Sequence, residues 1–508
     1  MRRLMLLFAL PSTMLITSAP LFADPDWSVV ASPSSNDCAL RAVAPVSADD
    51  VWAVGSHQSE SYENQTLILH WTGGTWSIVP GPNPNPSCPN GNVQFGGNAL
   101  NALAVVSSTD IWAVGEGCYP PPPQTGPAIT QLVEHWDGTS WSVVTVPDPI
   151  PGGESVLSDV AAVSASDVWA VGYTSEAIGA GTLIEHWDGT HWSVVPSPHP
   201  GTGGVLSAVA ANSATNAWAI GAFYDDGPDV WKTLILHWNG EGWSQVESPS
   251  VIGGFGDIAI VSSNDVWAVG VQSNGGTKTL IEHWNGTTWS VVPSPNPGPS
   301  QGSTSLGSIS AVTANNIWAA GSYHNQDTDL DQHRTLIMHW DGASWSIEPT
   351  PTPGKSADLA DIAVLPTGEG WAVGIFSDYP INTYDGTYTL PQTLVLNGAN
   401  YVAGVAAPQV SATPTLGPAT PNPMIDLVSF TIRLPRRAQI ELGIYDVSGR
   451  AVCSLLSGTT EAGERAATWN GRGSSGRPGV YFARLTVDGQ VVGTRPVALL
   501  GSSGTRDR

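Results

Sequence analysis

One arrangement of apolar and polar positions recurs along most of the chain. Each copy holds four short runs of β-type composition: an Ala-rich run such as LSDVAAVSAS (157–166), then VWAVG, TLIEHW and WSVVPSP. Because side chains alternate along a strand, Trp169 and Val171 of one VWAVG lie on one face, and Val168 and Ala170 lie on the other. Both faces are apolar, so each of these strands is expected to be covered on both sides.

The WAVG motif, or a close variant, occurs seven times at intervals of 49 to 60 residues. The copies begin at Trp52, Trp112, Trp169, Trp218, Trp267, Trp318 and Trp371. Four-stranded units with a period near fifty residues are typical of a β-propeller. The pattern predicts an all-β chain in which residues 24–405 form a seven-bladed β-propeller, with eight blades as the alternative.

Asp-Gly or Asn-Gly separates the third run of a copy from the fourth, as in TLIEHW-DG-THWSVV. Both central positions of a type I′ turn need a positive φ, which Gly, Asn and Asp accept most readily. A two-residue loop of this type predicts that Trp187 opposes Thr190 and that Glu185 opposes Trp192.

The tryptophans follow the repeat. Of the 22 Trp, only Trp231 and Trp469 fall outside the repeating slots and the related Trp27. The segment DWSVVASP (26–33) has the pattern of a fourth strand without the three that should precede it. Such a strand can complete the last blade and close the ring. Residues 401–405 are a second candidate for that place.

These repeats resemble secreted bacterial propeller repeats of the type VWAVG…TLIEHWNGTTWSVVPSP and, more distantly, kelch and Asp-box propellers. The DGTSW and NGTTW hairpins are similar to Asp boxes, but the spacing between Asp and Gly differs. The resemblance covers residues 26 to about 405 and implies the fold, since one fold can carry many functions.

The composition changes after residues 406–418, a Pro/Thr/Ala-rich linker. Residues 419–500 hold about seven alternating runs with turns every 8–12 residues, which predicts a small immunoglobulin-like β-sandwich. The segments PNP, YDVSGR, WNG and GVYF resemble the C-terminal module of the type IX secretion sorting family and of flagellar hook-cap scaffolds. The resemblance implies a sorting or attachment domain. The chain departs from it in having Arg495 where lysine is common, and in the polar tail 501–508.

The N-terminal segment carries a localisation signal. It has two arginines, an apolar run and a small-residue end at Ala23, which predicts a signal peptide over residues 1–23. The protein is therefore expected to be secreted or at the outer cell surface. No later segment is apolar for long enough to span a bilayer, so no transmembrane helix is expected in the mature chain.

The net charge of −25 is unevenly distributed. From residue 410 onward, eleven basic residues face seven acidic ones, whereas the rest of the chain has seven basic and thirty-six acidic residues. Such an acidic surface repels phosphate backbones, so nucleic acid is not an expected partner. The predicted propeller holds only two arginines, Arg41 and Arg334. A sialidase needs an arginine cluster for its carboxylate substrate, so this class is excluded.

Two sets of metal-ligand residue types occur in the propeller. One histidine occupies the same third-run slot in six copies: His70, His135, His186, His237, His283 and His339. This slot lies away from the centre of a propeller, so each histidine is expected to be a structural cross-strand residue. Asp327, Asp329 and Asp331 have alternate spacing that fits a loose Ca²⁺ site, although Gly and Glu of an EF-hand are missing. No other cofactor is expected.

Four cysteines are present, and export permits disulfides. Cys88 falls between a fourth and a first run, and Cys118 falls between a second and a third run. Both kinds of loop emerge on the same face of a propeller, so a Cys88–Cys118 disulfide is predicted.

The same face collects the loops that vary most between copies. They hold aromatic residues beside carboxylates: Trp231, Tyr224, Tyr323, Tyr62 and Asp226 are the candidate ligand-binding residues. Aromatics with acids suit a glycan or a surface or extracellular protein. We expect a monomeric, non-enzymatic binding scaffold. A secreted glycoside hydrolase or lyase is the alternative, because the chain holds many acidic residues that could form a catalytic pair, although no one carboxylate pair stands out.

Overall fold

The computed structural model describes residues 27–34, 37–59, 63–84, 97–119, 128–151, 153–176, 179–249, 251–273, 276–297, 303–325, 332–378, 391–398, 414–416, 428–434, 438–460, 463–471 and 479–499. These residues form strands and turns and no helix. None of them belongs to a helix able to cross a membrane. The chain divides into two compact units, Met1–Ala403 and Gly404–Arg508.

The first unit contains seven four-stranded antiparallel sheets, here called blades. Blade one has β2 (Cys38–Ser47), β3 (Asp50–Gln58), β4 (Asn64–Trp71) and β5 (Trp76–Ile78). Blade two has β6 (Ala99–Ser107), β7 (Asp110–Tyr119), β8 (Ala128–Trp136) and β9 (Trp141–Val143). Blade three has β10 (Glu154–Ser164), β11 (Asp167–Glu176), β12 (Gly179–Trp187) and β13 (Trp192–Val194). Blade four has β14 (Gly203–Ser213), β15 (Asn216–Asp225), β16 (Val230–Trp238) and β17 (Trp243–Gln245).

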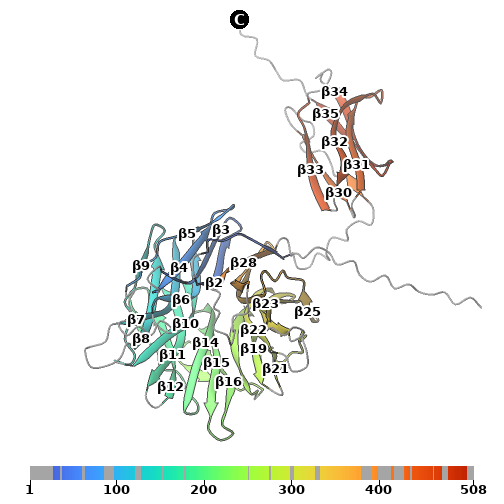
Figure 1. The fold of residues 1–508 in the computed structure, drawn as a ribbon. Coiled ribbons are helices and arrows are strands. Elements are labelled where there is room, and N and C mark those ends of the chain that lie inside the picture. Colours follow the sequence, from blue (N-terminus) through green and yellow to red (C-terminus); the bar gives the residue numbers. More distant parts are fainter. Residues whose placement is uncertain are drawn as a thin grey trace, which may run out of the picture. The chain divides into compact units, whose positions relative to one another are not determined.

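Blade five has β18 (Gly253–Ser262), β19 (Asp265–Ser273), β20 (Thr277–Trp284) and β21 (Trp289–Val291). Blade six has β22 (Thr304–Thr313), β23 (Asn316–Asn325), β24 (Gln332–Trp340) and β25 (Trp345–Glu348). Blade seven has β26 (Ser356–Val364), β27 (Gly370–Ser377), β28 (Gln392–Gly398) and β1 (Trp27–Val29). The blades follow one another around a ring that brings β28 beside β2 (Figure 1). The predicted all-β propeller is confirmed.

The ring closes through the first strand of the chain. β1 pairs antiparallel with β28, and Trp27 lies opposite Gly398. A Cβ at Gly398 would lie 2.9 Å from the Trp27 ring, and one at Gly370 would lie 2.7 Å from it. The absence of side chains at these two glycines therefore leaves room for the Trp27 ring, which is only 3% exposed. The predicted closure by residues 26–33 is confirmed; the alternative, residues 401–405, lies outside the described residues.

Seven clusters of buried side chains hold the first unit together, one at each seam between neighbouring blades. Trp169 and Val171 belong to the core shared with blade four. Val168 and Ala170 belong to the core shared with blade two. The predicted division of VWAVG into two buried faces is confirmed. The core of a propeller therefore lies between its sheets, with no helix to cover them.

The repeated tryptophan packs in the same way at successive seams. Trp169 lies 4.2 Å from the ring of His186 in its own blade, measured between ring centroids. From blade four, Trp238 and Trp243 approach it to 5.0 and 5.3 Å, the latter edge-on. Edge-on and tilted aromatic contacts of this length are favourable beyond the area they bury.

The glycine that ends each WAVG motif sets the path of the first strand. A Cβ at Gly172 would lie 1.9 Å from the carbonyl oxygen of Val156, so only glycine fits there. Two residues after Val156 the ladder shifts, and Ser158 is left without a partner in β11. The same shift occurs in the first strand of all seven blades. Each blade thus places a bulge residue at this point of its first strand.

The hairpins between third and fourth strands differ from the prediction. Trp187 pairs with Trp192, and Glu185 pairs with Val194, so the loop has four residues rather than two. Gly189 has a φ of +93°, but no positive φ occurs at Asp188, so the predicted type I′ turn is wrong. Instead, the Asp188 carboxylate accepts the N–H groups of Thr190 and His191 at 2.8 and 2.9 Å. These hydrogen bonds and that of the Thr190 hydroxyl lower the pKa of Asp188 to about 2.

The second unit contains β29 (Thr415–Leu416), β30 (Val428–Leu434), β31 (Ala438–Tyr445), β32 (Ala451–Thr460), β33 (Gly463–Trp469), β34 (Gly479–Val487) and β35 (Gln490–Leu499). One sheet has the order β29-β30-β33 and the other has the order β32-β31-β34-β35. A single apolar core includes residues of both sheets, with Trp469 and Tyr481 in edge-on contact at 5.0 Å. In the YDVSGR turn, the Asp446 carboxylate accepts the N–H groups of Ser448 and Arg450.

Candidate functional site

The candidate ligand-binding residues of blade four lie on the hairpin between its second and third strands, β15 and β16. β15 and β16 continue to Asp225 and Val230, and the turn between them is built by acidic residues. The Asp225 carboxylate accepts the N–H of Gly227 at 3.1 Å, and the N–H of Asp229 is donated to the Asp225 carbonyl at 2.9 Å. Asp229 has a φ of +62°, a region that Asp tolerates better than most residues. The result is an ordered tip with three carboxylates.

Two aromatic rings lie at the base of this tip. Tyr224 and Trp231 are cross-strand partners, and their rings meet edge-on with centroids 5.7 Å apart. Trp231 is 40% exposed, whereas each of the other 21 tryptophans is buried or half-buried. Trp231 therefore offers apolar area to solvent, unlike the tryptophans of the seams.

Hydrogen bonds fix the polar groups around these rings. The Tyr224 hydroxyl donates to the Asp229 carboxylate, which raises the pKa of the tyrosine. Thr202, just before β14, donates its hydroxyl to Asp226 at 2.6 Å. Lys232 neutralises Asp225 at 2.6 Å. An aromatic surface with fixed oxygen acceptors can stack on a ligand ring and accept its hydroxyl protons.

Another predicted ligand-binding residue, Tyr323, lies on a different blade from this group. Tyr323 lies on β23 of blade six, where it is half-buried and packs against the core of the seam between blades five and six. It pairs across the ladder with Arg334, two blades away from Trp231. Its ring packs at a different seam from the blade-four hairpin, and its role in ligand binding stays a prediction. Tyr62 lies outside the described residues.

The predicted calcium residues Asp327, Asp329 and Asp331 also lie outside the described part of the chain. Within that part, no group of three or more His, Cys, Asp or Glu side chains is arranged to hold a metal ion. Cys88 and the side chain of Cys118 on β7 likewise lie outside the described part. The predicted disulfide stays a prediction.

The six repeated histidines are structural, as predicted. His186 Nε2 lies 2.8 Å from Asp167 Oδ1 at the start of the second strand, while its ring contacts Trp169. The equivalent histidines contact the equivalent Asp or Asn at 2.8 to 2.9 Å: His70, His135, His237, His283 and His339. Each histidine thus ties the third strand to the second and supports the seam tryptophan.

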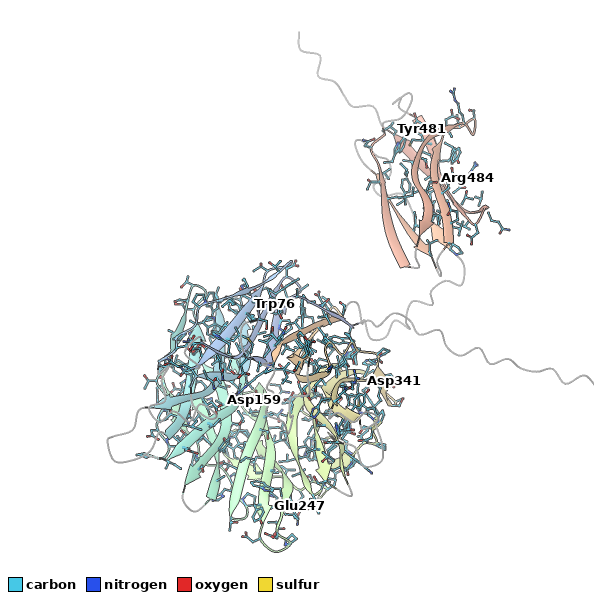
Figure 2. The ribbon with its side chains drawn as sticks, viewed as in Figure 1. Trp76, Asp159, Glu247, Asp341, Tyr481 and Arg484 are labelled. Atoms are coloured by element: carbon cyan, nitrogen blue, oxygen red, sulfur yellow. The ribbon has the colours of Figure 1, made fainter. Side chains whose placement is uncertain are left out.

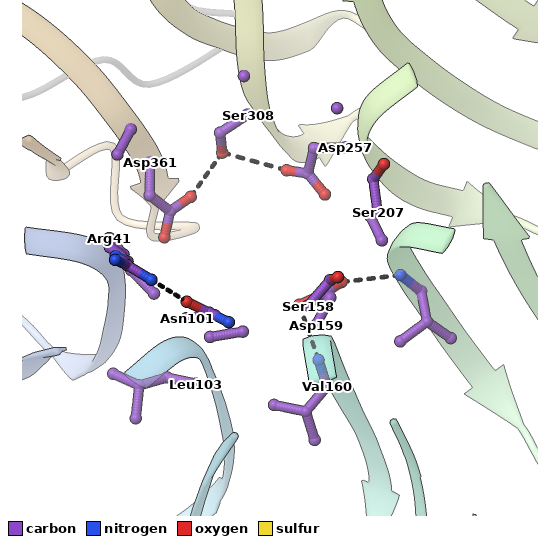
Figure 3. A pocket seen from close by; sticks show the side chains of 17 residues that line it. Arg41, Asn101, Leu103, Ser158, Asp159, Val160, Ser207, Asp257, Ser308 and Asp361 are labelled. Atoms are coloured by element: carbon purple, nitrogen blue, oxygen red, sulfur yellow. Dashed lines mark hydrogen bonds between the residues drawn. The ribbon is translucent and has the colours of Figure 1, made fainter. Parts of the chain in front are cut away.

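The centre of the ring holds a cavity that the sequence interpretation missed. It has a volume of about 260 Å³ and is lined by the first strands of all seven blades (Figure 3). The bulge residues lining it are Arg41, Asn101, Ser158, Ser207, Gly256, Gly307 and Ala360. Three carboxylates come next in the chain: Asp159, Asp257 and Asp361. Figure 2 places Asp159 near the middle of the ring, far from Asp341 at its rim.

Each of these carboxylates joins its own blade to the next. Asp159 accepts the N–H of Val160 at 2.8 Å and that of Val209, in blade four, at 2.7 Å. Asp257 and Asp361 bridge blades five to six and seven to one in the same way. The Ser308 hydroxyl lies within hydrogen-bond distance of both of these acids, 3.1 Å from Asp257 Oδ2 and 2.5 Å from Asp361 Oδ1. One oxygen of each carboxylate thus accepts a hydrogen bond within its own blade, and the other accepts one from the next blade.

The cavity changes the acidity of these groups. Burial, with the charge of Asp361 second, raises the pKa of Asp257 to about 7. Burial and the charge of Asp257 raise the pKa of Asp159 well above its ordinary value, and burial raises that of Asp361. The available signal was an Asp within an otherwise small, apolar first run in alternate copies: LSDVA, FGDIA and LADIA.

A second cavity of about 470 Å³ lies beside the outer strands of blade two. Apolar side chains such as Leu132, Val144 and Val146 line it, together with the buried amide of Asn98. Pro84, which also lines it, directly precedes residues outside the described part.

No family model matches the chain, and no curated protein matches it. Among solved structures, it is similar to an ulvan lyase of a polysaccharide lyase family at 13% identity, covering 65% of this chain and 88% of that chain, with a TM-score of 0.43. It is similar to the Trypanosoma rangeli sialidase at 10% identity, over 95% and 91% of the two chains, with a TM-score of 0.40. It is also similar to the SapL1 lectin, solved with methyl fucoside, at 13% identity over 63% and 98%, with a TM-score of 0.36. Similarities this distant support no inference about function.

Proposed function

We propose that the protein is a non-enzymatic glycan-binding scaffold whose contact site is the blade-four hairpin. The carrying observation is the exposure of Trp231 in a chain that otherwise covers its tryptophans. Tyr224 supports the Trp231 ring edge-on, and Asp226 and Asp229 supply acceptors held in place by Thr202 and Tyr224. A protein with a basic or aromatic segment is the other ligand class that this surface suits.

The charge of the chain narrows the proposed glycan. The net charge of −25, and three carboxylates at the hairpin tip, repel anionic sugars. We therefore favour neutral glycans or amino sugars over uronates and sulfated chains. In this proposal the protein acts outside the cell, and the second unit, an immunoglobulin-like module, serves sorting or attachment.

The test is a glycan array probed with the full chain, followed by affinity measurements with Trp231→Ala. We expect binding to neutral or amino-sugar glycans that Trp231→Ala removes. Val194→Ala is the matched control, because Val194 is 43% exposed on an outer strand of blade three. Binding that survives Trp231→Ala, or that the control removes equally, would place the contact elsewhere.

A second candidate function rests on the central acids. Asp257 and Asp361 share the hydroxyl of Ser308, and the pKa of Asp257 near 7 suits general acid–base chemistry. A glycoside hydrolase or lyase would use these acids on a ligand in the 260 Å³ cavity. Release of reducing ends from a neutral polysaccharide, lost in Asp257→Asn, would favour this function over binding alone.

A further inference from the structure

One third-strand position has the same place in all seven blades but two kinds of side chain. It directly precedes the repeated histidine, or Asn397 in blade seven, and is fully buried in every blade. Four blades place an apolar residue there: Leu69, Leu236, Met338 and Leu396. Each belongs to the core shared with the preceding blade. The other three blades place a carboxylic acid there: Glu134, Glu185 and Glu282.

The three acids occupy this position with apolar neighbours. Within the blades, Glu134 pairs with Ala113 and Val143, Glu185 with Ala170 and Val194, and Glu282 with Ala268 and Val291. The nearest titratable group on the same strand is the following histidine, which lies on the other face and bonds to the second-strand Asp.

The preceding blades offer the acids little polar contact. Near Glu134 lies Gly81, whose Cβ position would be 3.5 Å from Glu134 Oε2. Gln131 donates to Glu185 at 3.0 Å. In blade four the residue equivalent to Gln131 is Thr233, whose buried hydroxyl makes no hydrogen bond within the described residues. Among the described residues, both carboxylate oxygens of Glu134 and of Glu282, and one of Glu185, also have no hydrogen-bond partner.

We propose that Glu134, Glu185 and Glu282 are neutral acids in the folded propeller and form a pH-sensitive device that loosens three seams when they ionise. An ionised carboxylate without a partner is far more costly to bury than a neutral one. The affected seams join blades one to two, two to three, and four to five. The acids thus replace a permanently apolar contact with one whose strength depends on pH.

The acidity of the three groups agrees with this arrangement. Burial raises the pKa of Glu134 and of Glu282 to about 8. Burial raises that of Glu185 to about 7, against the lowering effect of Gln131. No charged neighbour contributes to these shifts. Each acid has its ordinary pKa of 4.5 when unfolded, so folding takes up protons between pH 4.5 and 8. The contribution of these three acids to stability is therefore fully present below about pH 4.5, falls through this window, and levels off above it.

Ionisation should weaken the seam between blades four and five the most. Other seams have additional bonds between first strands: Arg41 donates to Asn101, and Asn101 donates to the Leu157 carbonyl at 2.8 Å. Among the described residues, no side-chain hydrogen bond joins the first strands of blades four and five. Glu282 should therefore have the largest effect of the three.

The test is thermal unfolding of the full chain between pH 4.5 and 9, for wild type, Glu282→Leu and Glu282→Gln. Leu is the residue that the chain itself uses at this position in three blades. We expect the wild-type midpoint to fall with rising pH, and both variants to fall less. Glu282→Leu should melt above wild type at pH 9. Glu241→Leu, on an exposed loop of blade four, is the control and should run parallel to wild type.

The pH slope separates this device from simple apolar stabilisation. A Glu282→Leu curve shifted by the same amount at every pH would overturn the proposal, as would a Leu variant that melts below wild type at pH 9. A second measurement is the infrared difference spectrum at pH 6.5 between wild type and the variant with all three acids changed to Gln. We expect a protonated-carboxyl band present only in wild type. A carboxylate band in its place would also overturn the proposal. The infrared bands of the central aspartates cancel in the difference spectrum, because both proteins contain these residues.

Discussion

The seams between blades and the hairpin of blade four both depend on tryptophan, but they use it in opposite ways. Trp169 is 2% exposed and is enclosed by His186 and by two tryptophans of the next blade. Trp231 is 40% exposed and touches one tyrosine. The tryptophan repeated at a fixed slot is covered and stabilises the fold, whereas Trp231, outside the repeat, offers apolar area to solvent.

Removing residues 24–34 should have the largest effect on the framework side of this comparison. The deletion removes Trp27 from its site on Gly370 and Gly398 and leaves β28 as an unpaired edge. We expect a loss of more than the ~3–5 kcal/mol typical of one core tryptophan. Thermal unfolding of the chain without residues 24–34, compared with the intact chain, measures this loss. An unchanged midpoint would mean that another segment, such as residues 401–405, closes the ring.

Trp169→Ala should cost about 3–5 kcal/mol, because it leaves a cavity at the seam between blades three and four. Denaturant unfolding followed by tryptophan fluorescence gives the free energy of unfolding. Ligand binding well below the melting temperature should persist. A variant that keeps its stability but loses binding would break the distinction between the two kinds of tryptophan.

Asp257→Asn, at the centre of the ring, should have an effect of intermediate size on stability. Asn has one acceptor oxygen where Asp257 accepts from Ile258, Ile309 and Ser308, so we expect a loss of about 1–3 kcal/mol at pH 5. The folded pKa of about 7 lies above the ordinary 3.8, so wild-type stability from this group falls as pH rises between these values. The difference between the two proteins should therefore be smaller at pH 8 than at pH 5. A difference that grows with pH would show that the ionised form is the stabilising one.

Trp231→Ala should have the smallest effect on stability, within about 0.5 kcal/mol, since it removes surface area from an exposed strand end. Loss of glycan binding without a change in the melting temperature is the expected result. If the variant instead melts several degrees lower and still binds, Trp231 is a packing residue and the comparison fails.

Much of the framework was predictable because the same pattern of residues recurs in every blade. The seven copies of the WAVG motif or its variants identified the second strand, its two buried faces and the structural role of His186. The hairpin register was not predictable from Asp188-Gly189, because a side chain that accepts two backbone N–H groups stabilises a four-residue loop over a two-residue one. For the candidate hairpin site, Trp231, Tyr224 and Asp226 were singled out because they lie outside the repeat, and the structure places Tyr323 on a different blade.

Local pattern alone therefore determined the strands, the repeat unit, the β-propeller and the closing role of Trp27, since these depend on the period of apolar residues. The tertiary structure decided which polar residues meet. Asp159, Asp257 and Asp361 are about one hundred or two hundred residues apart in the chain, and only closure of the ring brings them to one cavity. The burial of Glu282 likewise depends on the blade packed against it. A side chain's own sequence neighbours do not specify its contacts across a seam, because those contacts come from a different repeat.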